Sequence, residues 1–241
     1  MIPLRDNVPS SRRPLVTWTI LVVCALVFFY ELLLPEQSLL VFTHLYGVVP
    51  ARFTNDAYAL AVGYPENGYE ALFTYMFLHG GWFHFLFNMW VFWIFADNVE
   101  EALGPGRFAA FYVLCGLLAA VAHILFNWNS TVPVIGASGA IAGVMGAYFR
   151  LFPKARVVTL IPIIIIPWIV ELPAVVFLGI WFAIQVLSGL TGSLASGGSA
   201  DVAFWAHVGG FVAGLYLVRL FLPRGCRYCF DPRERRYDRE P

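Results

Sequence analysis

The chain contains 241 residues, of which 60% are hydrophobic and only 12% are charged, and its formal net charge at pH 7 is zero. Soluble domains carry about 25% charged residues, so this composition leaves too little polar surface to cover a globule in water. It excludes an ordinary soluble protein and predicts an all-α polytopic membrane protein that forms one compact bundle.

Taken in chain order, six apolar segments are predicted to cross the membrane. The first follows an arginine-containing flank, as a signal peptide would, but its apolar run is long enough to span and no A-x-A-like cleavage site follows it. We therefore expect it to be the first span. The predicted spans are 15–34, 72–97, 107–127, 134–151, 157–190 and 202–222.

The fifth of these segments is too long for one straight crossing of a hydrocarbon core about 30 Å thick, which takes about 20 residues. Three prolines and a glutamate interrupt its first half: Pro162, Pro167, Pro173 and Glu171. We expect this half to be kinked or to lie near the membrane interface before the crossing proper.

Basic residues set the expected orientation. With six spans, fourteen of the fifteen lysines and arginines fall on one side, and Arg52 is left on the other. This asymmetry places both termini in the cytoplasm. It predicts a cytoplasmic tail at 1–14, a membrane domain at 15–222 and a charged cytoplasmic tail at 223–241. We expect a multi-pass protein of a bacterial inner membrane, with the lipid bilayer but no nucleic acid among its partners.

The four cysteines are scattered. Cys24 and Cys115 lie in predicted spans, where we expect them to pack. Cys226 and Cys229 form one C-x-x-C pair in the tail, which offers only two of the four ligands of a structural zinc site. We therefore expect no metal and no cofactor.

In lipid, an unpaired polar side chain is costly and is a functional-site hypothesis by default. Four polar side chains stand out within the predicted spans: His84, Asn88, Ser138 and His207. Ser138 precedes Arg150 by twelve residues, and His207 precedes Arg219 by twelve, so each lies about 18 Å above an inner arginine. The other two side chains are four residues apart on one helical face near the outer end of their span. All four are therefore predicted at comparable depth.

Small residues accompany these polar groups at helical spacing. Glycine pairs four residues apart let two membrane helices approach until their backbones nearly touch. The glycines that we expect to support helix packing are Gly136, Gly139, Gly143, Gly210 and Gly214. The last two lie on the helical face of His207. The pairing predicts that Ser138 and His207 come within hydrogen-bond distance and form an activated nucleophile.

The remaining histidines are expected to be structural: His44 in the long outer loop, His79 before the second span and His123 near the end of the third. A carboxylate partner for His207 is also hard to find. Asp201 lies six residues earlier, roughly 9 Å along the helix axis and about 120° around it. The sequence therefore predicts a Ser–His dyad, with packing in place of a carboxylate to orient the imidazole.

Three motifs resemble those of the rhomboid intramembrane serine proteases, over about residues 15–222. They are H-x-x-x-N at His84–Asn88, G-x-S-G at Gly136–Gly139, and A-H-x-x-G-x-x-x-G at Ala206–Gly214. Their order and their placement on the second, fourth and sixth spans match the family. The resemblance implies a six-transmembrane-helix rhomboid-like bundle.

The resemblance also implies roles for individual residues. Ser138 would attack a peptide carbonyl, and His207 would take its proton and return it to the leaving amine. The backbone N–H of Ser138 and the side chains of His84 and Asn88 would stabilise the oxyanion. Substrates would be transmembrane segments of other proteins, cut near their outer end in a polar cavity open to the outer side.

One departure from the family concerns the first outer loop. Many members carry a Trp-Arg pair four and three residues before a threonine, but the positions before Thr74 hold Glu70 and Ala71. We therefore expect residues 35–71 to be anchored differently.

Other functions remain open at this stage. A catalytically inactive rhomboid-like binder or chaperone of membrane segments would typically lack the serine or the histidine, and both are present. A small-solute transporter would have ionisable residues throughout the membrane depth. A haem site could use His84, His123 or His207 but would not require Ser138. A zinc metalloprotease is disfavoured because the sequence contains no H-E-x-x-H. The sequence does not indicate an oligomeric state.

Overall fold

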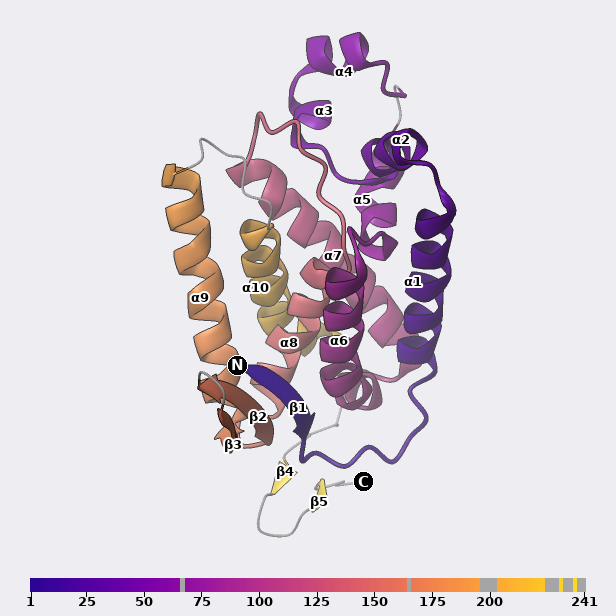
Figure 1. The fold of residues 1–241 in the computed structure, drawn as a ribbon. Helices are drawn as coiled ribbons and strands as arrows, with labels where there is room; N and C mark the ends of the chain where they lie inside the picture. The colour runs from indigo at the N-terminus through magenta and orange to yellow at the C-terminus, as the bar shows by residue number, and fades with distance from the viewer. Residues whose placement is uncertain (66–67, 164–165, 196–202, 224–229, 232–235, 238–241) are drawn as a thin grey trace.

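The computed structural model describes residues 1–65, 68–163, 166–195, 203–223, 230–231 and 236–237. Most of these residues are helical, and the long helices stand side by side in one bundle (Figure 1). The bundle consists of α1 (Leu15–Leu33), α6 (Trp82–Leu103), α7 (Pro105–Phe126), α8 (Ser138–Leu151), α9 (Ala174–Ala195) and α10 (Phe204–Phe221). The sequence predictions about Asp201, Cys226 and Cys229 concern residues that lie outside the described part of the chain.

Four helices in the described part of the chain are both long and apolar enough to cross a membrane: α1, α7, α10 and residues Ala174–Gly192 of α9. The other two bundle helices, α6 and α8, do not meet both criteria. Helix α8 has only 14 residues, and α6 carries Asp97, Glu100 and Glu101 near its end. The helical membrane fold is therefore confirmed, whereas the number of six spans stays a prediction.

Helix α8 lies in the middle of the bundle, and its residues from Gly139 to Tyr148 are all buried. Its glycines face those of α10. A Cβ atom added at Gly210 would lie 2.0 Å from the carbonyl oxygen of Gly139, and one at Gly214 would lie 1.8 Å from that of Gly143. The two backbones are thus in direct contact, which no larger residue would permit.

The segment predicted as the fifth span, 157–190, is helical only in its second part. Residues Arg156–Ile163 (β2) and Ile166–Pro173 (β3) pair as antiparallel strands, and Ile2–Asp6 (β1) pairs with the outer edge of β2. The run is rich in valine and isoleucine, which favour strands, and its prolines cannot donate the hydrogen bonds of a helix interior. Within the mostly helical fold, a three-stranded sheet that the sequence did not predict therefore precedes α9, and residues 1–14 include one of its strands.

The loop between α1 and α6 contains short helices at the upper end of the bundle (Figure 1). They are α2 (Glu36–Tyr46), α3 (Pro50–Thr54), α4 (Asp56–Val62), η1 (Gly68–Glu70), α5 (Ala71–Thr74) and η2 (Tyr75–Phe77). Near the C-terminus, β4 (Phe230–Asp231) pairs with β5 (Arg236–Tyr237).

Arg52 anchors this loop. The residue is only 6% exposed, and its Nη1 donates a hydrogen bond of 2.8 Å to the carbonyl oxygen of Leu45. Its Nη2 lies 3.8 Å from a carboxylate oxygen of Glu70, and its guanidinium lies over the ring of Tyr64. A Cβ atom at Gly68 would lie 1.3 Å from Nη2, so the guanidinium occupies the space that a larger residue would need. An arginine from earlier in the loop therefore takes part in the anchoring that the absent Trp-Arg pair would supply.

Carboxylates attach α1 to the rest of the bundle at both of its ends. Glu100 of α6 accepts hydrogen bonds from the backbone N–H groups of Val16 and Thr17, at 2.9 and 2.8 Å, in the first turn of α1. At the other end, Glu31 of α1 accepts from the N–H of His79 at 3.0 Å. The first contact places a carboxylate at a helix N-terminus, where the unpaired donors and the helix dipole favour it.

Strand β1 is held to the bundle by side chains as well as by the sheet. The indole N–H of Trp90 donates to the carbonyl oxygen of Pro3 at 2.6 Å, and the hydroxyl of Tyr148 donates to Asp6 at 2.5 Å. Burial raises the pKa of Asp6 from its ordinary value near 3.8 to about 6, and the hydrogen bond from Tyr148 partly opposes this rise. The folded protein therefore holds the proton of this carboxyl to a higher pH than the unfolded chain does.

Replacing Arg52 by leucine is expected to destabilise the protein by about 2 kcal/mol, because it removes a buried hydrogen bond and leaves the carbonyl of Leu45 unpaired. Thermal unfolding in detergent micelles measures the effect, and amide exchange should rise in residues 44–74. Exposed Arg107 offers a control, since Arg107→Leu should change neither quantity. Equal effects of the two variants would contradict the anchoring role.

The raised pKa of Asp6 predicts a pH-dependent stability. Its contribution is fully present below about pH 4 and is lost as the pH rises to about 6, because the unfolded state ionises first. A difference of about two pH units corresponds to at most about 3 kcal/mol. The Asp6→Asn variant should therefore melt at a higher temperature than the parent protein at pH 7, and the two should converge near pH 4. Parallel melting curves across this range would contradict the prediction.

Candidate active site

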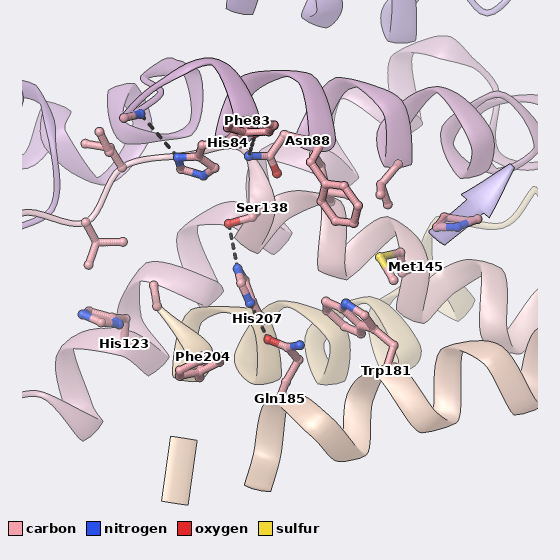
Figure 2. Close-up of a pocket in the computed structure, with 18 of the residues that line it drawn as sticks. Phe83, His84, Asn88, His123, Ser138, Met145, Trp181, Gln185, Phe204 and His207 are labelled. Carbon is pink, nitrogen blue, oxygen red and sulfur yellow. Dashed lines mark hydrogen bonds between the residues drawn. The ribbon is translucent and has the colours of Figure 1, made fainter. Parts of the chain in front are cut away.

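A cavity of about 830 Å³ is lined by residues of β1, α6, α7, α8, α9, α10 and the chain before α8. All four polar side chains that the sequence singles out line it, as Figure 2 shows. Most of the other lining residues are apolar: Met1, Pro3, Phe83, Phe87, Val91, Val132, Pro133, Val134, Ile135, Ile141, Met145, Phe177, Trp181, Ala203 and Phe204. A few polar groups in a largely apolar cavity are the common form of a small ligand or substrate site.

Ser138 and His207 are in direct contact. Ser138 is the first residue of α8, and its Oγ lies 2.8 Å from Nε2 of His207 on α10 (Figure 2). The glycine contact between the two helices brings these side chains together, because Gly139 lies next to the serine and Gly210 one turn after the histidine. The structure therefore has the Ser–His hydrogen bond that the motif spacing predicts.

The other ring nitrogen of His207 has a partner that the sequence reasoning missed. Its Nδ1 lies 2.8 Å from Oε1 of Gln185 on α9. The prediction that packing orients the imidazole is therefore incomplete, because an amide oxygen also contacts it. Gln185 could have been noticed in the sequence, because it is a polar residue within the apolar run WFAIQVL. The start of the helix within the long fifth segment was not known, however, so the depth and the direction of this side chain could not be predicted.

His84 and Asn88 lie on α6 across the cavity from His207. The N–H of Gly80 donates to Nδ1 of His84 at 3.3 Å, so in the neutral imidazole the proton is on Nε2. The amide of Asn88 donates to the carbonyl oxygen of His84 at 2.9 Å. Both residues share the cavity wall with Ser138, and His84 presents an N–H donor on the side of the ring that faces the chain before α8.

Gly136 brings the chain before α8 close to His84. Its φ of +127° is one that residues with a side chain rarely adopt, and an added Cβ would lie 2.7 Å from Nε2 of His84. The glycine of the G-x-S-G motif is therefore required by backbone conformation and by the neighbouring ring, whereas the sequence suggested a helix-packing role for it.

The three histidines predicted as structural differ in position. His44 lies within 2.7 Å of the hydroxyl of Tyr64 in the outer loop, and His79 is buried against aromatic rings. His123 lines the cavity, with Asn127 as its neighbour at 3.4 Å. It belongs to the same chamber as Ser138, which its place near the end of the third predicted span did not indicate.

Comparison with known proteins identifies the class to which this fold and site belong. Residues 66–224 match the model of the Rhomboid domain. The chain belongs to the rhomboid family.

The relatives with described functions include several proteases. The chain is 34% identical over 165 residues to the rhomboid protease GluP of Bacillus subtilis, an alignment that covers 62% of this chain and 30% of that protein. It is 33% identical over 135 residues to the putative rhomboid protease YdcA of the same organism, covering 56% and 61%. It is 28% identical over 135 residues to the rhomboid protease GlpG of Klebsiella pneumoniae, covering 54% and 41%. The chain thus matches between about a third and three fifths of the length of these relatives.

Replacing Gly136 by alanine is expected to cost about 1–3 kcal/mol, because the new side chain must adopt a strained φ and displace His84. Thermal unfolding in micelles measures this cost. Gly106 provides the matched control, since an added Cβ there meets no atom within 4 Å. A Gly136→Ala protein as stable as Gly106→Ala would contradict the argument.

Proposed function

We propose that this protein is an intramembrane serine endopeptidase that cleaves transmembrane segments of other membrane proteins. The observation that carries the proposal is the 2.8 Å contact between Ser138 Oγ and His207 Nε2 inside a membrane bundle. A serine hydroxyl is a weak nucleophile until a base accepts its proton, and a hydrogen-bonded imidazole is such a base. The names of the protease relatives support the same reaction class.

The proposed reaction proceeds in two stages. Ser138 Oγ attacks the peptide carbonyl carbon while its proton passes to Nε2 of His207. The tetrahedral intermediate collapses, the imidazolium gives its proton to the leaving amine, and an acyl-enzyme remains on Ser138. Water, activated by the same imidazole, then attacks the ester and restores the serine.

The negative charge of the intermediate needs donors that are already in place. Ser138 begins α8, where backbone N–H groups have no partner within the helix and the helix dipole favours an anion. His84 Nε2–H and the amide of Asn88 lie on the opposite wall of the cavity and complete the proposed oxyanion site. This use of the helix N-terminus also explains why the nucleophile is the first residue of α8.

The cavity suits a peptide segment that has left its helical conformation. A regular helix buries its carbonyl groups in hydrogen bonds, so small or helix-breaking residues at the cut site would expose a carbonyl for attack. With basic residues concentrated on one side, the cut would fall near the outer end of the substrate, and both termini of the protease would be cytoplasmic. We propose a bacterial inner membrane as its location.

Covalent labelling of the detergent-purified protein with a fluorophosphonate probe tests the activated serine. Wild-type protein should label, and Ser138→Ala and His207→Ala should not. Loss of the base alone should slow the reaction by on the order of 10²- to 10⁴-fold. Ser130 also lines the cavity and is the matched control, because Ser130→Ala should label like the wild type. Equal labelling of all four proteins, or none in any, would contradict the proposal.

Cleavage distinguishes a protease from a binder of membrane segments. A single-span test protein with a glycine-alanine pair near its outer end is reconstituted with each variant in liposomes. We expect wild type and Ser130→Ala to release two fragments, cut within the outer half of the span, as mass spectrometry would show. Co-purification of the intact test protein without fragments would instead favour the non-catalytic reading.

A further inference from the structure

Gln185 is the side chain that lies behind His207. It comes from the middle of α9, is 9% exposed, and its Oε1 lies 2.8 Å from Nδ1 of the imidazole. Its flanking residues Ile184 and Val186 are apolar, and the amide itself faces the cavity beside His207. A buried amide in such surroundings is costly unless it is hydrogen-bonded, and His207 supplies the partner.

The amide oxygen determines which ring nitrogen carries the proton. A neutral imidazole has one N–H, and a carbonyl oxygen can only accept a hydrogen bond. Nδ1 must therefore carry the proton that faces Gln185, which leaves the lone pair of Nε2 free to accept the Ser138 hydroxyl. The opposite tautomer would place an N–H toward Ser138 and could not remove its proton.

Helix α9 also restricts the plane of the imidazole. Trp181, one turn before Gln185, places its ring 6.0 Å from the ring of His207 at an interplanar angle of 37°. The imidazole thus has a hydrogen-bonded amide at one ring nitrogen and a tilted indole ring beside it, both from α9 (Figure 2). Serine and histidine come from α8 and α10, while a third helix orients the histidine.

An amide suits this position better than a carboxylate does. When His207 is protonated during the reaction, Nδ1–H still donates to Gln185 Oε1, and the amide dipole stabilises the positive charge. A carboxylate would do the same more strongly but would be a buried negative charge in the resting protein. Among the described residues that line the cavity, the other titratable side chains are two histidines, His84 on α6 and His123 on α7, and no lysine or arginine is present to balance a negative charge.

We propose that Gln185 is the positioning residue of His207. Its amide oxygen stabilises the tautomer that carries the proton on Nδ1, so that Ser138, His207 and Gln185 form one chain of hydrogen bonds. The proposal rests on the proposed protease function for its catalytic consequence. The tautomer of His207 can be measured independently of any protease activity.

The first test compares fluorophosphonate labelling rates of Gln185→Met, Gln185→Glu and the control Thr191→Val, with full-length protein in micelles. Methionine keeps nearly the volume of glutamine but has no strong acceptor, so labelling should slow by on the order of 10- to 100-fold, less than on loss of the base itself. Gln185→Glu, which keeps an acceptor oxygen, should remain within about tenfold of wild type. Thr191 lies further along α9, and its hydroxyl donates to the carbonyl oxygens of Leu187 and Ser188 in the same helix, so Thr191→Val should label like wild type.

Labelling of Gln185→Met at the wild-type rate would overturn the proposal, as would equal loss in the methionine and glutamate variants. For a cleaved test protein, the change should appear in kcat with KM nearly unchanged, because Gln185 acts through His207. If the labelling rate of the variants falls only in proportion to a lowered melting temperature, Gln185 has a structural role, and this result would also overturn the proposal.

The second test reads the tautomer directly. Protein with ¹⁵N-labelled histidine is studied by NMR well above the ordinary histidine pKa of about 6.5, and a His207→Gln sample assigns the signal. Wild-type His207 should carry its proton on Nδ1, and Gln185→Met should show a mixture of tautomers. A proton on Nε2 in the wild type would overturn the proposal whether or not Ser138 labels. The Nδ1–H tautomer without labelling of Ser138 would defeat the protease function alone, so the two failures are distinguishable.

Discussion

The contact between the backbones of α8 and α10 determines the rest of the site. Two glycines on each helix remove the side chains that would separate them, and an added Cβ at Gly214 would lie 1.8 Å from a carbonyl oxygen of α8. Membrane helices gain little from a hydrophobic effect within lipid, so such close packing supplies much of their attraction. Because both helices are rigid over this stretch, the contact fixes the distance between Ser138 and His207. Helix packing and site geometry therefore depend on the same glycine contacts.

Several buried polar groups in this bundle take part in hydrogen bonds that hold its segments together. Glu100 satisfies the first N–H groups of α1, Glu31 accepts from His79, and Arg52 donates to a loop carbonyl. The two glutamate pairings join segments that are distant in sequence, and the Arg52 hydrogen bond holds the loop between α1 and α6 together. In a medium where an unpaired polar group is costly, hydrogen bonds of this kind select one arrangement of helices that hydrophobic packing would leave undetermined.

The sequence predicted the helical class and the Ser138–His207 pair, because both follow from local spacing: apolar runs of membrane length, and glycines in register with one histidine. It did not predict the hairpin of β2 and β3, since a continuous run of valine, isoleucine and proline is equally apolar as a helix or as strands. It also missed Gln185, whose contact depends on where α9 begins. Once the hairpin takes residues 156–173, α9 starts at Ala174, and its register relative to α10 is a tertiary property that spacing within one segment does not contain.

Distance and orientation in this site have different origins. Glycine contacts fix how far the α10 backbone stands from Ser138, but they leave the two side-chain torsions of His207 free. A histidine that turned its ring would lose the serine without any movement of the helices. Gln185 and Trp181 restrict these torsions from α9, and together with Phe177 of the same helix they line the cavity. The base is thus positioned by a helix that also forms a wall of the cavity, so an occupant that shifted this wall would act on the imidazole through the same hydrogen bond.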